Sequence, residues 1–100
     1  MCGAKAGGVS TEGLVLGDDQ SVVQGTVTRG GEPVAGAYVR LLDRSGEFTA
    51  EVPTSATGQF RFFAAPGTWT VRTLAPRSPV VDRPVVASGG AVAEVAVSLD

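Results

Sequence analysis

Residues 55–72 read SATGQFRFFAAPGTWTVR, and this stretch decides the fold class of the chain. Phe60 and Phe62 lie two residues apart, so a β-strand places both rings on one face, and Trp69 begins a second alternating run. The Pro-Gly pair at 66–67 fixes one φ angle and tolerates a positive one, so it predicts a turn that folds the two strands into a hairpin. The stretch therefore predicts an all-β fold with these aromatic side chains at the centre of its core.

Short alternating runs separated by turn residues continue on both sides of this stretch, from Ser21 to the end of the chain. Three prolines make 76–84 a poor central strand, so 80–86 is predicted to be at best an edge strand. No segment carries an apolar period of 3.6 residues, and no substantial helix is predicted. Seven strand candidates at roughly 8–12-residue spacing are typical of an antiparallel seven-stranded β-sandwich.

The alternation assigns one set of side chains to the interior. These inward positions are Val23, Val27, Ala37, Val39, Leu41, Phe48, Val52, Phe60, Phe62, Trp69, Val71, Val95, Val97 and Leu99. Full burial of a large apolar side chain stabilises a fold by about 1.5–3 kcal/mol. Trp69 is the largest of the set, and its replacement by Ala is expected to cost roughly 3–5 kcal/mol.

Residues 1–19 differ in composition from the rest of the chain. They are small, polar and rich in Gly, with few apolar residues. We predict a flexible N-terminal arm over 1–19, with a short docked piece near 14–16 as an alternative for part of it, and one sandwich domain over 20–100.

Charge and hydropathy exclude several classes of partner. Eight Lys and Arg against ten Asp and Glu give a net charge of −2, without the basic stripe that nucleic-acid binding requires. No apolar run approaches the length of a membrane span, and the start of the chain lacks the apolar region of a secretory signal. A single cysteine cannot form an internal disulfide, which agrees with a reducing compartment. We therefore predict a cytoplasmic protein that binds neither nucleic acid nor membrane.

Four segments in order resemble a known domain family. They are VVQGTV at 22–27, EPVAGAYVRL at 32–41, TGQFRF at 57–62 and APGTWTV at 65–71. Together they resemble the carboxypeptidase regulatory-like domain, a seven-stranded sandwich of the transthyretin-like (prealbumin-like) class, which is related in architecture to immunoglobulin-like sandwiches. The resemblance implies the fold and is nearly silent on function, because such domains serve as spacers, binding modules and stabilising appendages.

A second resemblance covers the whole chain. MCGA at the start, EFTAEV at 47–52 and FRFFAAPG at 60–67 are similar to a small actinobacterial family of unknown function. Members of that family are sometimes labelled SseC and are commonly encoded beside a thiosulfate sulfurtransferase. The resemblance implies a link to sulfur transfer by gene neighbourhood only, since the chain lacks the active-site loop of a rhodanese.

Common catalytic constellations are absent from the sequence. The chain has no His, so it offers no Ser-His pairing and no imidazole base. The glycine pairs at 7–8 and 30–31 do not lead from a strand into a helix, so they are not a phosphate-binding loop. Asp18 and Asp19 are better explained as solvated turn residues than as cation ligands. We predict no catalytic residues, no metal site and no cofactor.

Cys2 is the only thiol in the chain. Removal of Met1 would place this thiol beside an α-amine, and a nearby ammonium lowers a thiol pKa and favours the nucleophilic thiolate. Cys2 is therefore a candidate sulfur acceptor from a partner enzyme. The alternatives are a soft-metal ligand in an oligomer and an incidental cysteine without a role.

Outward positions on the predicted strands suggest an interface. Tyr38, Arg40 and Leu42 alternate with inward residues, as do Arg61 and Phe63, and Arg72 and Leu74. If these strands are neighbours, their aromatic and aliphatic side chains form an exposed patch ringed by arginines, which is typical of interface anchors. The alternatives are ordinary scattered exposure of apolar residues and coverage of the patch by the arm.

These observations favour a non-enzymatic accessory module that binds a protein partner, with the neighbouring sulfurtransferase as the expected one. A carbohydrate- or small-ligand-binding module is the competing class, with Tyr38 and Phe63 as the only stacking candidates. A purely structural, self-associating domain is the third.

Overall fold

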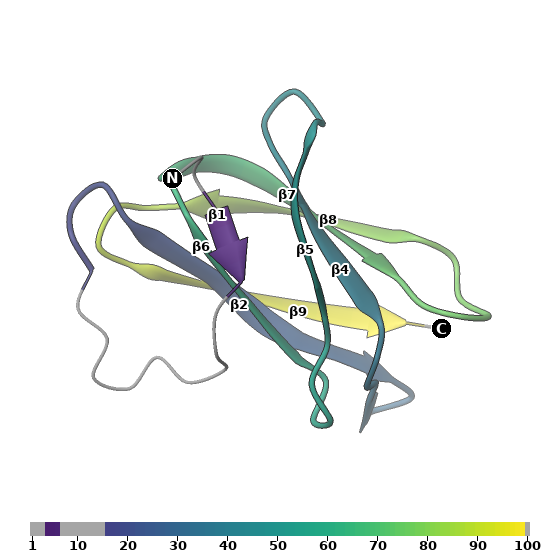
Figure 1. Cartoon of the computed structure of the whole chain (residues 1–100). Helices are drawn as coiled ribbons and strands as arrows, with labels where there is room; N and C mark the ends of the chain where they lie inside the picture. The colour runs from purple at the N-terminus through teal and green to yellow at the C-terminus, as the bar shows by residue number, and fades with distance from the viewer. Residues whose placement is uncertain (1–3, 7–15, 100) are drawn as a thin grey trace.

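The computed structural model describes residues 4–6 and 16–99, which form nine strands and no helix in that part of the chain (Figure 1). The strands are β1 (Ala4–Ala6), β2 (Ser21–Arg29), β3 (Glu32–Pro33), β4 (Tyr38–Leu42), β5 (Phe48–Pro53), β6 (Gln59–Ala64), β7 (Gly67–Leu74), β8 (Val81–Ala87) and β9 (Val92–Leu99). Among the described residues, no helix is long and apolar enough to cross a membrane.

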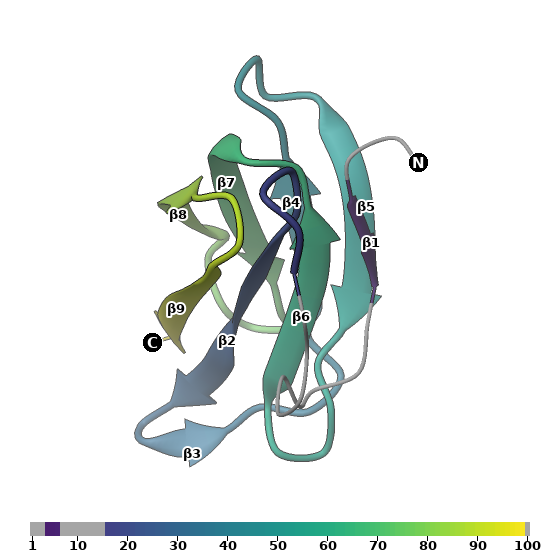
Figure 2. The ribbon, with the colours of Figure 1, turned by 90° about the vertical axis from the view of Figure 1, so that its left-hand side faces the viewer.

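The strands form two sheets that pack face to face (Figure 2). The β2 sheet contains β1, β6, β2 and β3 in that order, with β9 also paired to β2. The β4 sheet has the order β5-β4-β7-β8. At the two sides of the sandwich, β1 approaches β5 and β9 approaches β8. The predicted β-sandwich is therefore confirmed.

Pairing and strand count differ from the prediction in two respects. The β2 and β9 strands run parallel, whereas all other pairs are antiparallel (Figure 1). Parallel neighbours require a long crossover, and here almost the whole sandwich lies between the two strands in sequence. The two additional strands, β1 and β3, are too short to produce an alternating pattern. β1 lies within residues 1–19, which the sequence assigns to a flexible arm. The predicted boundary between arm and sandwich domain at residue 20 stays a prediction.

The predicted hairpin over 55–72 is wrong, although both of its strands exist. β6 belongs to the β2 sheet and β7 to the β4 sheet, so the Pro-Gly connection carries the chain from one sheet to the other. Gly67 has a φ of +144° at this corner, and the Trp69 indole donates a hydrogen bond to the Ala65 carbonyl at 2.9 Å. Alternation specifies which face of a strand is apolar but not which strand lies beside it.

The interior matches the predicted set, except for one residue. All the predicted inward side chains are buried apart from Phe48, which is 61% exposed. The register of β4 and β5 shifts between Leu41 and Leu42, so an irregularity separates Phe48 from Ala50 and Val52. An extra residue in a strand moves the following side chains to the other face, which explains the wrong assignment of Phe48.

The proline-rich segment forms an edge strand, as expected. β8 pairs only with β7, and it is the last strand of the β4 sheet. Its outward side chains are exposed, while Val81 and Val85 pack against the core and Ala87 is buried in it. The β4 sheet thus presents one face to the core and the other to solvent.

Candidate functional site

The outer face of the β4 sheet, here called the outer β4 face, brings together exposed aromatic, aliphatic and charged side chains. On β4, Val39 and Leu41 point into the core, so Tyr38 and Arg40 point outward. The same alternation places Arg72 on the outer side of β7 and Asp82 on the outer side of β8. Three neighbouring strands therefore contribute these side chains to one surface.

A charged row crosses this face from edge to edge. Arg40 lies opposite Glu51 on β5 and opposite Arg72 on β7, and Arg72 lies opposite Asp82 on β8. Arg40 Nε donates to Glu51 Oε2 at 2.6 Å. Arg72 binds both oxygens of Asp82, through Nε at 2.9 Å and Nη2 at 3.0 Å. The hydrogen bond from Arg72, with its charge, lowers the pKa of Asp82, and the same pairing raises the pKa of Arg72.

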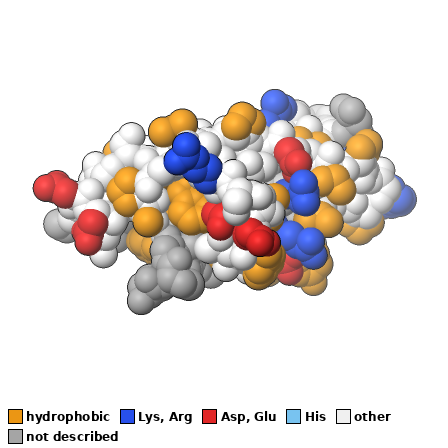
Figure 3. Space-filling model, turned by 90° about the horizontal axis from the view of Figure 1, so that it is seen from above, with side chains coloured by type: hydrophobic (Ala, Val, Ile, Leu, Met, Phe, Trp, Pro, Cys, Tyr) orange, Lys and Arg blue, Asp and Glu red, His pale blue; other side chains and the backbone are white. Residues whose placement is uncertain are grey.

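Exposed apolar side chains lie on the same face as the charged row. Tyr38 is 53% exposed, Phe48 61% and Val86 69%. The Phe48 ring lies on the same side as Arg40, whose guanidinium carbon is 6.0 Å from the ring centroid. Viewed from above, the molecule shows acidic and basic side chains next to each other, with hydrophobic side chains exposed around them (Figure 3).

The structure divides the six residues that the sequence assigned to one interface. Tyr38, Arg40 and Arg72 lie together on the outer β4 face. Leu42 lies opposite Phe48 and is only 6% exposed.

Arg61 and Phe63 are on β6, in the other sheet, so they cannot complete the predicted patch. The guanidinium carbon of Arg61 lies 5.2 Å from the centroid of the Phe63 ring, and Arg61 is only 7% exposed. The predicted patch required the strands of all six residues to be neighbours, and this condition is not met because β6 lies in the other sheet. The two stacking candidates for a sugar, Tyr38 and Phe63, are on different sheets and do not form one platform.

Four contributors to this face were not predicted as interface residues. Phe48 was assigned to the core, and Val86 and Asp82 lie in the segment that the prolines made unpromising. Glu51 forms a surface ion pair with Arg40. The spacing in the sequence did not indicate that these residues share a face with Arg40 and Arg72, because strand order and the register shift place them there.

The other sequence candidates contribute no site in the described residues. Cys2 lies outside the described residues. Asp18 and Asp19 are exposed in a turn in which Gln20 N donates to the Gly17 carbonyl at 3.1 Å. Among the residues that the structure describes, no group of three or more His, Cys, Asp or Glu side chains is arranged to hold a metal ion.

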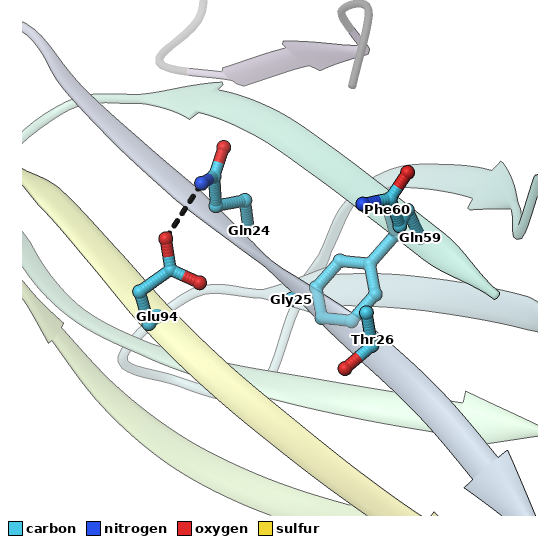
Figure 4. Close-up of a pocket in the computed structure, with 6 residues that line it drawn as sticks. All are labelled: Gln24, Gly25, Thr26, Gln59, Phe60 and Glu94. Carbon is cyan, nitrogen blue, oxygen red and sulfur yellow. Dashed lines mark hydrogen bonds between the residues drawn. The ribbon is translucent and has the colours of Figure 1, made fainter. Parts of the chain in front are cut away.

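A shallow depression of about 60 Å³ lies on the β2 sheet and is lined by residues of β2, β6 and β9 (Figure 4). Gln24 Nε2 donates to Glu94 Oε2 at 2.6 Å at its rim. Phe60 lies beside Gly25, its cross-strand neighbour, where the missing side chain makes room for the ring. Ligand pockets usually measure hundreds of cubic ångströms, so this depression results from strand packing rather than from a built ligand site.

Comparisons with known proteins give a family but no activity. The pattern of the family described as "Protein of unknown function (DUF1416)" matches residues 2–99. Two uncharacterized proteins of Mycobacterium tuberculosis, Rv0814c and Rv3118, are each 47% identical over 100 residues, covering 99% of both chains. An uncharacterized protein of Mycolicibacterium smegmatis is 66% identical over 58 residues, covering 57% of this chain and 64% of its own length.

Solved structures share the fold at low sequence identity. The dioxygenase domain of a dioxygenase carbohydrate-binding protein fusion from Streptomyces sp. SirexAA-E is 15% identical, with a TM-score of 0.64 over 82% of this chain and 80% of that one. The minor pilin GBS52 of Streptococcus agalactiae is 11% identical, with a TM-score of 0.63 over 85% of this chain and 45% of that one. Likeness at this level shows the sandwich fold alone.

Proposed function

The chain belongs to the DUF1416 family of unknown function, and on that premise we propose that it is a non-enzymatic accessory module that binds a protein partner through the outer β4 face. The observation that carries this proposal is the exposure of Tyr38 and Phe48 on the same face as Arg40 and Arg72, which lie opposite each other on neighbouring strands. Aromatic residues and arginine are enriched in protein interfaces and in their energetic hot spots.

The geometry of this face suits a docking surface. Its side chains come from paired strands rather than from loops, so little conformational entropy is lost when a partner binds. Tyr38 and Phe48 still expose more than half of their area, and complete burial of such a side chain contributes about 1.5–3 kcal/mol. In many protein interfaces a few such anchors carry most of the binding free energy.

The non-enzymatic part of the proposal is supported by the composition. The chain has no His and therefore no imidazole that could act as a general base. The proposed location is the cytoplasm. A chain with one Cys forms no internal disulfide, which agrees with a reducing compartment.

The test is capture of native partners by the full chain from a lysate of the source organism. Tyr38→Ser combined with Phe48→Ser should abolish capture while the melting temperature stays nearly unchanged, because both side chains are exposed. Val92→Ser is the matched control, since Val92 is a 38% exposed apolar residue of the β2 sheet. Equal capture by the wild type and the double variant would contradict the proposal.

The partner that we propose comes from the sequence resemblance alone and is a thiosulfate sulfurtransferase, with Cys2 as the sulfur acceptor. The Cys2 thiolate would attack the outer sulfur of the enzyme's persulfide, the S–S bond would break, and the enzyme's thiolate would leave. Docking through the sandwich would raise the local concentration of this thiol.

Intact mass spectrometry after incubation with thiosulfate and the sulfurtransferase tests this step. We expect one added sulfur per chain, absent in Cys2→Ser and removed by mild reduction, because a persulfide is reducible whereas a sulfinic acid is not. An unmodified Cys2 beside a persulfidated enzyme would exclude the acceptor role and leave the binding-module proposal intact.

A further inference from the structure

Arg40 and Arg72 stand directly opposite each other on the two central strands of the β4 sheet. Like charges at directly opposed positions repel each other and destabilise an antiparallel pair. Glu51 and Asp82, on the two edge strands, each compensate one of the arginines. Across the four strands the row therefore runs acidic, basic, basic, acidic, with both positive charges in the middle.

The two guanidinium groups keep hydrogen-bond donors that no described residue occupies. Arg40 uses only Nε for Glu51, which leaves both of its terminal nitrogens. Arg72 uses Nε and Nη2 for Asp82, which leaves Nη1. The side chains are 42% and 39% exposed, so these donors reach solvent. A planar carboxylate is the acceptor that best matches such neighbouring N–H groups.

We propose that the arginine pair binds the carboxylate of an acidic residue within an otherwise apolar segment of the partner protein. This inference rests on the proposed function, because it names the chemistry that the same face recognises. Apolar side chains border the pair in both strand directions: Tyr38 opposite Leu74 on one side, and the exposed Phe48 on the other. A segment with one Asp or Glu between apolar residues complements this arrangement in charge and in polarity.

A second copy of the chain fits this face less well than an acidic partner. A two-fold axis through the centre of the row would set the arginine pair of one copy against the same pair of the other. Such a contact opposes like charges at the middle of the interface, where water is excluded and repulsion is strongest. Charge complementarity therefore favours a different protein with an acidic segment.

The test uses the full chain to select peptides from a random library displayed on phage. We expect selected peptides to carry Asp or Glu flanked by apolar residues. Arg40→Gln and Arg72→Gln should each weaken their binding at least about tenfold, because a charge-assisted hydrogen bond is lost. Arg83→Gln is the matched control, since it removes an exposed arginine of β8 outside the charged row, and it should leave binding unchanged.

Glu51→Gln separates recognition from folding. This substitution removes the carboxylate that competes for Arg40 and leaves the arginine in place, so the acidic peptides should bind more tightly than to the wild type. A purely structural role for the row predicts weaker or unchanged binding instead. The melting temperature of each variant confirms that the sandwich is intact.

Several results would overturn the carboxylate inference. These are peptides without acidic residues, peptides that bind both arginine variants with unchanged affinity, and displacement by inorganic phosphate as effective as by free peptide. The proposed function survives such a result if Tyr38→Ser still abolishes peptide binding, and it fails if Tyr38→Ser has no effect. A concentration-dependent dimer that Tyr38→Ser dissociates would assign the face to a second copy.

Discussion

The two sheets carry outward-facing residues in the same alternating pattern, but the outer face near Val22 and Arg61 is far less exposed than the outer face near Tyr38 and Phe48. On the β2 sheet, Val22 is fully buried and Arg61 is 7% exposed, although both point away from the core residues of their strands. On the β4 sheet, Tyr38 and Phe48 are 53% and 61% exposed. Alternation along a strand thus predicts the side on which a residue lies, and the surroundings decide whether that side is open.

Charge reversal at one arginine of each face should give the largest difference between the two sheets. Arg61→Glu is expected to destabilise the fold by about 3 kcal/mol or more, because it places an uncompensated carboxylate at a buried position. Arg72→Glu should change the stability far less, because its ion pair is exposed and screened by solvent. Urea unfolding of both variants measures the difference, and equal midpoints would show that the faces do not differ as described.

Close strand packing in the β2 sheet predicts a second large effect. A Cβ atom at Gly25 would overlap the carbonyl oxygen of Val95 and approach the Phe60 ring to 3.0 Å. Gly25→Ala must therefore push β9 away from β2, at a cost of roughly 1–3 kcal/mol. Thr26→Ala, the next residue of the strand and exposed, should change stability by less than about 0.5 kcal/mol. Thermal unfolding measures the stability of both variants. An unchanged melting temperature for Gly25→Ala would mean that β2 and β9 can move apart without a loss of stability.

The sequence was sufficient to predict the fold class and nearly all of the core. Val23, Val39 and Phe62 follow the period of two that a half-buried strand requires, and each is fully buried. The hairpin failed because the residues at 66–67 are compatible with a turn within one sheet and with a corner between two. Phe48 failed because a register shift leaves no mark in an alternating pattern.

The candidate site was only partly predictable for the same reason. Tyr38, Arg40 and Arg72 could be predicted to point outward from their own strands, and they do lie together. Their acidic partners could not be identified, because the pairing of Arg72 with Asp82 depends on β8 joining β7. Strand order is a non-local property that depends on the packing of the whole sandwich.

Acid should lower the free energy of unfolding only slightly through the exposed Arg72–Asp82 pair. Pairing with Arg72 lowers the pKa of Asp82 from its ordinary value of 3.8, so the folded state holds this proton less tightly than the unfolded chain. Its stabilising contribution is therefore complete above the unfolded pKa and is lost as the pH falls through the lower folded pKa. The stability difference between wild type and Asp82→Asn should be constant above about pH 4 and shrink below it. Urea midpoints across this range measure it, and a difference that grows in acid would contradict the pairing.

Hydroxyl-radical footprinting of the full chain, alone and with its captured partner, tests most directly whether the outer β4 face binds. Aromatic side chains report their own exposure, and the molecule carries such reporters on both sheets. We predict that the partner protects Tyr38 and Phe48 and leaves Phe63 of the β2 sheet unchanged. Protection of Phe63 with Tyr38 and Phe48 still fully reactive would place the partner on the opposite face and contradict the account.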